Sequence, residues 1–298
     1  MTTHGLVVVD KPAEWTSHDV VAKLRKIYRQ RRVGHAGTLD PDATGVLLVG
    51  LGRPTRLLRF LQDTGKAYRA TIAFGVSTTT LDASGEVVDR RPMPIDRADV
   101  EEAAKSFLGE IEQLPPMVSA VKIEGRRLHE LARRGEEVDR APRSVRIDRL
   151  DIEEFEAGPY PTATVLVECS SGTYVRSLAA DLGIRLGGVA HLSALRRLRV
   201  GSFTLDEAHT LSGIETDPEA VVLPPATAVR DLQRIDVDPE QARAIVHGVT
   251  FPAAVLVGAD AGPGPFAIIG REGDLLAVYE RRRAAVKPAV VIAPVEAT

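Results

Sequence analysis

Residues 34–45 read Gly-His-Ala-Gly-Thr-Leu-Asp-Pro-Asp-Ala-Thr-Gly, and no other stretch says as much about the fold. Its glycines permit tight backbone turns, while Pro41 fixes its own φ angle and restricts Asp40 to extended conformations. Asp40 is therefore expected on a rigid turn just before the apolar run 46–50, which makes it a candidate catalytic carboxylate. The plainer interpretation is an Asp-Pro turn in which the aspartate caps its own backbone, and it is favoured for such a pair taken alone.

Short strands and helices are interspersed on both sides of this loop. We expect strands at residues 6–10, 68–74, 145–152 and 163–169, with 46–50 as a strand or the start of a helix. We expect helices at 18–29, with Ser17 as N-cap, and at 96–108, 127–134 and 177–186. Residues 30–45 and 77–85 are expected as loops. Because no strict strand-helix-strand rhythm occurs, the pattern predicts an α+β fold with a mixed, largely antiparallel sheet flanked by helices.

A composition change near residues 223–231, Leu-Pro-Pro to Asp, predicts a domain boundary. After it, a helix at 238–247 and strands at 266–269, 275–279 and 286–292 suggest a small β-rich barrel. The sequence therefore predicts a main domain at 1–230 and a second domain at 231–298.

Composition excludes several classes of protein. The 298 residues carry 38 Lys plus Arg against 41 Asp plus Glu, a net charge of −3, and 44% are hydrophobic, as in ordinary globular proteins. Apolar runs stay well short of the ~20 residues that span a bilayer, and the N-terminus lacks a secretion signal, so we expect a cytoplasmic protein without membrane contact. The single cysteine, Cys169, agrees with a reducing compartment.

The common cofactor motifs are missing as well. Seven scattered histidines and one cysteine do not form the clusters that zinc sites use. The phosphate-loop, dinucleotide-binding and serine-hydrolase motifs do not occur either. We therefore expect neither metal nor cofactor, and a protein that works through ordinary side chains or only binds.

Local charge indicates a partner. Residues 20–39 contain six basic residues and no acidic one: Lys23, Arg25, Lys26, Arg29, Arg31 and Arg32. Such a run is most often a solvated face, but here the excess charge has no partner on the same helix. A basic cluster on a chain of nearly neutral charge favours a localised phosphate-binding surface, as in nucleic-acid-binding proteins.

The loop resembles a known family. HAGTLDPDATGVL is similar to the motif GHxGxLDPxAxGxL of the TruB-type tRNA pseudouridine(55) synthases, in which the aspartate is catalytic. Other family segments follow in order: Asp10-Lys11-Pro12 with Trp15-Thr16-Ser17, Lys66-Ala67-Tyr68, and residues 113–122, 169–178 and 190–197. The resemblance covers residues 5–200, and the part after 231 resembles a PUA-type RNA-binding domain. Two departures are Ala13-Glu14 after Lys11-Pro12, and Thr80-Leu81 before Asp82.

The resemblance implies catalytic roles for four residues. Asp40 would be the nucleophile, and Arg176 would keep this carboxylate ionised and aimed. Tyr174, expected on a strand face shared with Arg176, would assist the proton shift at C5. Tyr68 would stack on the flipped uracil. The plainer alternatives are core packing for both tyrosines and a solvent-facing helix start for Arg176.

The resemblance also implies RNA contacts. His35 would fill the space that the flipped base leaves or contact the displaced nucleotides. The plainer alternative is a hydrogen bond that orders its own loop. Leu195 would line the pocket, while Lys11, Lys66 and Asp82 would support the loop or contact RNA. Arg31 and Arg32 would bind phosphates, so affinity should fall with salt.

The implied activity is isomerisation of uridine to pseudouridine at position 55 in the T-loop of tRNA, after base flipping and without cofactor. The implied enzyme is a monomer that binds the tRNA T-stem-loop without an obligatory protein partner. Two alternatives stay open from sequence: an RNA-binding or tRNA-folding factor, and a synthase that acts on another RNA, such as a ribosomal RNA or a guide-directed target.

Overall fold

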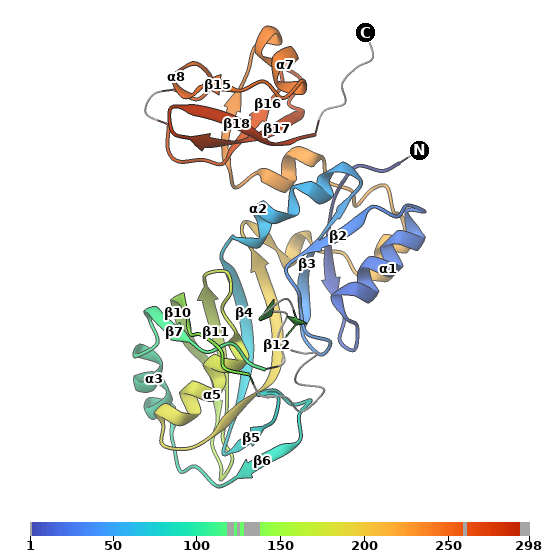
Figure 1. Cartoon of the computed structure of the whole chain (residues 1–298). Helices are drawn as coiled ribbons and strands as arrows, with labels where there is room; N and C mark the ends of the chain where they lie inside the picture. Colours follow the sequence, from blue (N-terminus) through green and yellow to red (C-terminus); the bar gives the residue numbers. More distant parts are fainter. Residues whose placement is uncertain (1, 118–121, 124–125, 128–137, 259–260, 293–298) are drawn as a thin grey trace. The chain divides into compact units, whose positions relative to one another are not determined.

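The computed structural model describes residues 2–117, 122–123, 126–127, 138–258 and 261–292 (Figure 1). The chain forms two compact units that are interleaved in sequence. The first unit consists of residues 1–41, 45–63 and 200–298, and the second consists of residues 42–44 and 64–199.

Three strands form the centre of the first unit. Strands β1 (Gly5–Lys11) and β2 (Val33–Ala36) both pair antiparallel with β3 (Thr44–Leu51). Since side chains alternate along a strand, Val7 and Val9 face one side and Leu6 and Val8 the other. The side with Val7 and Val9 is covered by helices α1 (Ser17–Ile27) and α6 (Leu211–Thr216), which contribute Val20, Leu24 and Ile214.

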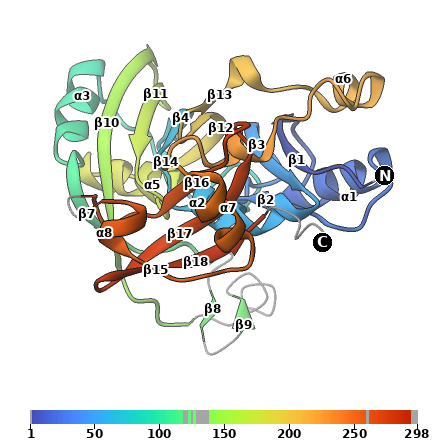
Figure 2. The ribbon, with the colours of Figure 1, turned by 90° about the horizontal axis from the view of Figure 1, so that it is seen from above.

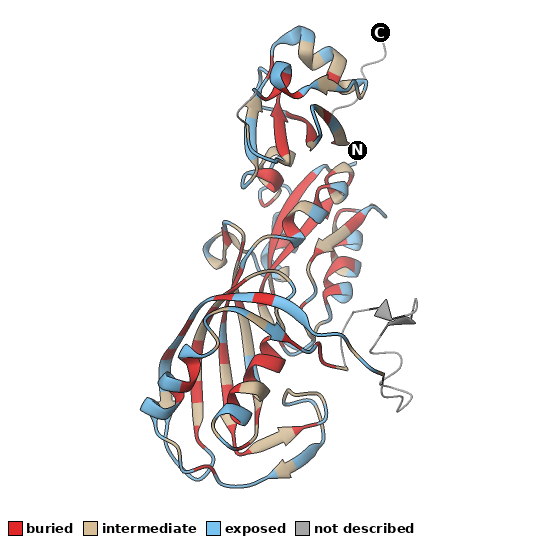
Figure 3. Ribbon diagram, turned by 60° about the vertical axis from the view of Figure 1, so that its left-hand side comes forward, coloured by how far each residue is buried: buried red, intermediate tan, exposed pale blue. Residues whose placement is uncertain are grey.

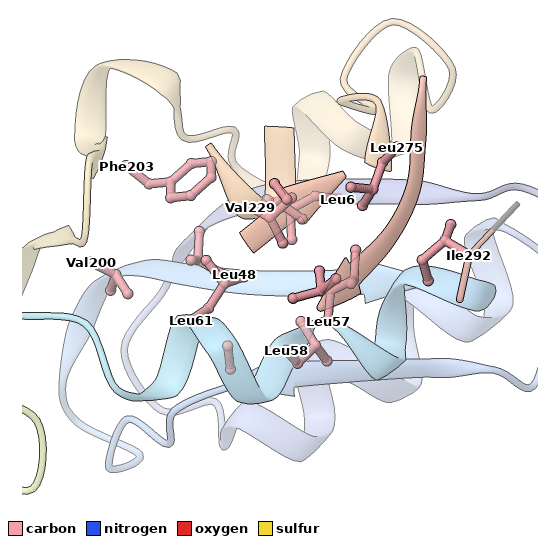
Figure 4. Packing of buried hydrophobic residues seen from close by; sticks show 14 of the residues in the cluster. Leu6, Leu48, Leu57, Leu58, Leu61, Val200, Phe203, Val229, Leu275 and Ile292 are labelled. Carbon is pink, nitrogen blue, oxygen red and sulfur yellow. The ribbon is translucent and has the colours of Figure 1, made fainter. Parts of the chain in front are cut away.

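The side with Leu6 and Val8 packs against a second hydrophobic cluster, shown in Figure 4. It contains the side chain of Leu57, which follows η1 (Arg53–Arg56), and side chains of α2 (Leu58–Gln62), of η3 (Pro225–Val229) and of the C-terminal sheet. That sheet has the order β14-β16-β17-β18-β15, with bounds Gln233–Asp236, Phe266–Ile269, Leu275–Arg282, Ala285–Val291 and Phe251–Pro252.

The C-terminal sheet has a core on each face. Ala267 and Ile269 lie in the cluster shared with β1 and β3, whereas Phe266 and Ile268 pack with helices α7 (Pro239–Val246) and α8 (Ala253–Leu256). Figure 2 shows both helices beside this sheet. The segment after residue 230 therefore shares a hydrophobic cluster with the N-terminal strands. The domain boundary at residue 230 stays a prediction.

The second unit is built on a sheet with the order β12-β4-β11-β10-β7. The strands span Ala190–Val200, Lys66–Phe74, Thr162–Cys169, Arg143–Glu156 and Gly109–Gln113. The pairs β4–β11, β11–β10 and β10–β7 are antiparallel. Helix α3 (Arg97–Lys105) packs against β10 and helix α5 (Val175–Arg185) against β4, and both helices bury one side (Figure 3).

Smaller elements complete the two units. Strands β5 and β6 (Val76–Thr78 and Val87–Arg90) pair with each other, as do β8 and β9 (Lys122–Ile123 and Arg126–Arg127). The first unit also contains β13 (Phe203–Thr204) and η2 (Leu205–Glu207). No helix in the described part of the chain is both long and apolar enough to cross a membrane.

The predicted fold class is confirmed, but several local predictions are wrong. Thr16, not Ser17, caps α1, because its hydroxyl accepts from the Asp19 amide in a capping box while Ser17 is buried. The predicted loop 30–45 contains β2, and the predicted loop 77–85 begins within β5 and follows it. Strand β12 was not expected from the sequence. The helix predicted at 127–134 lies almost wholly outside the described residues.

Candidate active site

Asp40 lies in the first unit, on the loop between β2 and β3, and is half-buried. The preceding residue anchors it: the Leu39 side chain is buried, and its amide donates to Ser17 Oγ at 2.9 Å. Ser17 Oγ in turn donates to the Leu39 carbonyl at 3.1 Å. Gly37 and Gly45 flank the loop at φ +84° and +102°, which other residues rarely adopt. The loop therefore holds the carboxylate on a fixed backbone.

Lys11 supports the same loop from below the surface. Its side chain is fully buried, and Nζ donates to the carbonyl oxygens of Pro12 (2.8 Å), Trp15 (2.5 Å) and Pro41 (2.8 Å). An ammonium group has three donors, and a buried charge is tolerated only when such partners are supplied. Of the two roles considered for Lys11, this geometry favours ordering of the loop.

His35 lies on β2 in a basic groove of the first unit. Its ring stands edge-on to the His18 ring, with centroids 5.4 Å apart and planes at 82°. The groove encloses about 520 Å³ and is lined by Arg31, Arg32, Val33, Gly34, His35, Thr55, Arg56, Leu58, Arg59 and Gln62. Four of these residues are arginines and none is acidic, so the groove suits an anion of phosphate type.

The basic run around α1 is mostly solvated. Arg31 and Arg32 are exposed, and Arg32 Nε donates to Thr55 Oγ1 at 3.0 Å. Lys23 forms an ion pair of 2.6 Å with Glu215, a partner that the local sequence did not predict. The other bases of the run keep most of the excess positive charge at the surface.

Three further candidates, Tyr68, Tyr174 and Arg176, lie at one end of the sheet of the second unit. Strand β4 begins opposite the end of β11, with Lys66 paired to Cys169. Tyr68 is two residues into β4 and buried. From Cys169 the chain turns into α5, with Tyr174 as its N-cap and Arg176 in its first turn. The prediction that Tyr174 and Arg176 share a strand face is therefore wrong, since the helix begins between them.

Arg176 points inward and is held by an acid. Its guanidinium Nη1 lies 3.4 Å from Asp82 Oδ2 and donates to the Thr80 carbonyl at 3.3 Å. The Arg176 side chain is only 6% exposed and that of Asp82 20% exposed. The solvent-facing alternative for Arg176 is thereby excluded. Because this ion pair is shielded from water, it orients the guanidinium more firmly than a surface pair would.

Asp82 is itself fixed by its own turn. Its Oδ1 accepts from Thr80 Oγ1 at 2.5 Å, from Ser84 Oγ at 2.6 Å and from the Ser84 amide at 3.1 Å. These bonds leave Oδ2 directed at Arg176. Asp82 thus acts in this structure as the orienting partner of the arginine.

Sequence reasoning missed Gln113 as a site residue. Gln113, at the end of β7, is 1% exposed and forms two hydrogen bonds with the backbone of Tyr174. Its Nε2 donates to the Tyr174 carbonyl at 3.0 Å, and its Oε1 accepts from the Tyr174 amide at 2.7 Å. Ser177 Oγ donates to the Leu114 carbonyl at 2.9 Å. The sequence feature that could have identified Gln113 is the family-like segment 113–122, which begins with this glutamine.

The remaining candidates belong to the second unit as well. Lys66 is 7% exposed, and its Nζ donates to the Thr64 carbonyl at 2.6 Å, which favours a supporting role. Leu195 is half-buried on β12. Among the described residues, no group of three or more His, Cys, Asp or Glu is arranged to hold a metal ion.

The two units provide different functional groups. The first unit offers a carboxylate on a rigid loop and a basic groove, and the second offers buried tyrosine and arginine side chains with fixed partners. A carboxylate can serve as a nucleophile or a base, an aromatic ring can stack on a nucleobase, and exposed arginines can bind phosphates.

Comparison with known proteins relates these residues to a family. The model of the TruB family pseudouridylate synthase N-terminal domain matches residues 25–175, and that of the tRNA pseudouridylate synthase B C-terminal domain matches residues 176–229. The tRNA pseudouridine synthase B of Thermobifida fusca is 46% identical over 298 residues, covering 97% of this chain and 98% of the relative. That of Symbiobacterium thermophilum is 50% identical over 246 residues, or 82% of each chain.

Solved structures agree on the fold. A Cbf5-Nop10-Gar1 complex contains a chain that matches with TM-score 0.75 and 27% identity, covering 97% of this chain and 85% of the other. An H/ACA RNP bound to a substrate RNA matches with TM-score 0.75 at 24% identity, covering 98% and 86%. Since the family models together span residues 25–229 and close relatives cover nearly the whole chain, this chain belongs to the TruB family of tRNA pseudouridine synthases, a class of isomerases.

Proposed function

We propose that the protein converts uridine 55 in the T-loop of tRNA to pseudouridine, with Asp40 as the nucleophile and no cofactor. The reaction breaks the N1–C1′ bond, forms a C5–C1′ bond, moves a proton off C5 and leaves N1 protonated. Nothing is oxidised or hydrolysed, so side chains alone can supply the chemistry. The observation that carries the proposal is the anchoring of Asp40 on a loop pinned by Ser17 and Lys11.

The other roles follow from the same proposal. Tyr68 stacks on the flipped base, Tyr174 assists the proton transfer at C5, and Arg176 sets the electrostatics near the nucleophile. The buried Arg176–Asp82 pair supports this role, because a guanidinium held by a fixed carboxylate is preorganised. Flipping a base out of its stack costs a few kcal/mol, which binding of the T-stem-loop must supply.

The proposed enzyme acts in the cytoplasm as a monomer, without an obligatory protein partner. It recognises the T-stem-loop by shape and phosphates, as is usual for structured RNA. The part from residue 231 is proposed to add RNA affinity as a PUA-like domain, and Leu195 is proposed to line the base pocket.

The decisive experiment follows tritium release from an unmodified tRNA transcript labelled at uracil C5. We expect release by the wild type, mapped to the T-loop uridine by carbodiimide, and none by Asp40→Asn. Asp42→Asn is the matched control, because Asp42 lies in the same loop but is exposed, and it should keep near wild-type activity. If the wild type binds tRNA tightly but releases no tritium from it, this proposal is replaced by the hypothesis of a tRNA-folding factor or of a synthase that acts on another RNA.

The basic groove gives a separate prediction about binding. The double variant Arg31→Glu/Arg32→Glu should weaken tRNA binding at low salt by roughly 10-fold or more, because two phosphate contacts are lost and two repulsions gained. The slope of log affinity against log salt should become shallower by about 2. Filter binding between 50 and 300 mM KCl measures both. An unchanged slope would place the RNA on another face.

A further inference from the structure

Arg197 is the largest of the side chains that the described part of the structure buries completely. It lies on β12 and is only 1% exposed. Its neighbours Arg196 and Arg199 are half-buried, so burial is particular to this position and not general to the strand. Burying a guanidinium is costly unless it is hydrogen-bonded, and an apolar side chain would fill the same space at lower cost. The buried guanidinium of Arg197 therefore needs an explanation other than packing.

One partner of Arg197 is the side chain of Tyr68. Strand β12 is the neighbour of β4 in the sheet, and both side chains are buried. Burial lowers the pKa of the Arg197 guanidinium, and a hydrogen bond with Tyr68 opposes this shift. The guanidinium starts from so high a value that it stays charged at neutral pH.

The direction of this hydrogen bond is fixed by chemistry. A guanidinium has five N–H donors and no acceptor, so the Tyr68 hydroxyl oxygen must accept from Arg197. The hydroxyl hydrogen is then available only to an acceptor other than Arg197. A charged donor also makes the bond stronger than one between neutral groups, so it restricts the rotation and tilt of the ring.

We infer that Arg197 is a positioning residue of the reaction, which acts by holding the ring and hydroxyl of Tyr68 in the orientation needed against the flipped base. This inference rests on the proposed function, because it assumes that Tyr68 contacts the uracil. Arg197 itself is buried and does not contact RNA phosphates under this inference. It acts on the chemical step through Tyr68.

A double-mutant cycle tests this inference. The full-length wild type, Arg197→Met, Tyr68→Phe and the double variant are assayed for kcat and KM by tritium release from the labelled transcript. We expect each single variant to lower kcat by roughly 10- to 100-fold with KM little changed, as for loss of one charge-assisted hydrogen bond. The double variant should be no slower than the slower single variant. Arg197→Lys should recover part of kcat, because it keeps a charged donor.

Arg69→Met is the matched control. Arg69 lies on β4 next to Tyr68, on the opposite face, and is about half exposed in an ion pair with Glu153. Its loss should leave kcat near the wild-type value. If Arg197→Met does not fold, as judged by circular dichroism, the same cycle with Arg197→Lys decides.

The outcomes separate the two claims. If the wild type is active and the fold-loss of kcat in the double variant equals the product of the two single losses, Arg197 does not act through Tyr68. The same conclusion follows if KM alone rises. A wild type that releases no tritium would overturn the proposed function, and with it this inference.

Discussion

The chemistry of individual side chains depends on burial that the sequence shows only in part. Asp40 could be singled out because Pro41 and the flanking glycines restrict its backbone. Asp82 could not be singled out as a partner of Arg176, because it is 94 residues away in sequence and is brought close only by the fold. The same holds for Arg197, which reads as one base of a charged cluster and is in fact buried.

Cys169 gives a prediction at this scale. Burial raises the pKa of its thiol to about 11, opposed in part by the Thr173 hydroxyl and the Lys66 charge. At pH 8 the native thiol should therefore be protonated and react with a disulfide reagent at least roughly 100-fold more slowly than in the unfolded chain. Because the chain has one cysteine, denaturant should release one reactive equivalent. Rapid reaction of the native protein would contradict the burial of Cys169.

Secondary-structure elements are positioned by a few side chains at their ends. Helix α5 begins where Gln113 bonds to both backbone groups of Tyr174, and α1 begins at the Thr16 capping box. Such contacts fix where an element begins, so their loss should disturb both the stability of the fold and the geometry of the site.

Gln113→Ala tests this at α5. It leaves the Tyr174 amide without its partner and leaves the Tyr174 carbonyl only the bond from the Leu178 amide, so the free energy of unfolding should fall by about 1–3 kcal/mol. We also expect kcat to fall by roughly 10-fold, because Tyr174 and Arg176 move with the helix start. Gln113→Glu should be no better, since a carboxylate cannot donate to the Tyr174 carbonyl. Glu112→Ala, at the exposed neighbour, should change neither value, as chemical denaturation and tritium release can check.

The elements that were predicted correctly have strong periodic patterns. Strands β1 and β11 are rich in β-branched residues, and α3 ends at Lys105, shortly before Gly109 with φ +89°. Strand β12 was missed because Ala190–Val200 contains three arginines and three leucines at mixed spacing, without the alternation typical of strands. Its conformation is set by pairing within the sheet, which local propensity does not encode.

At the scale of the molecule, the C-terminal segment contributes to the core of the first unit. Leu275 is 4% exposed in the cluster that includes Leu6 and Leu57 (Figure 4). Leu275→Ala should lower the free energy of unfolding by about 3 kcal/mol, whereas Val255→Ala, 61% exposed in α8, should change it by less than about 0.5 kcal/mol. Deletion of residues 231–298 should expose this cluster and lower solubility. A truncated chain with an unchanged melting temperature would contradict the shared core.

Alkaline pH should also unfold the first unit. Burial raises the pKa of both Tyr28 and Tyr279 to about 12, and their hydroxyls donate to the carbonyls of Pro218 and Val249 at 2.7 Å. Because the folded state holds these protons more tightly, their stabilisation is complete below pH 10 and is lost as the pH rises towards 12. Each contributes up to about 3 kcal/mol.

Phenylalanine variants separate this effect from other ionisations. Tyr28→Phe and Tyr279→Phe should each be slightly less stable at pH 7 but lose less stability between pH 10 and 12 than the wild type. Tyr160→Phe, at a position 37% exposed, should follow the wild-type curve. Equal slopes for all four proteins in urea titrations would count against buried hydroxyls at Tyr28 and Tyr279.

The interleaving of the two units bears on how the chain folds as it leaves the ribosome. Strand β1 emerges first, yet its edge is completed by Leu223 and His209, whose backbones bond to Leu6, Val8 and Asp10. At translation rates of about 5–20 residues per second, those partners arrive roughly 10–40 s later. Residues 64–199, by contrast, are continuous in sequence and make up nearly all of the second unit. The apolar strand β1 therefore remains without these partners while the second unit is synthesised. A chaperone that binds nascent chains would act in this interval.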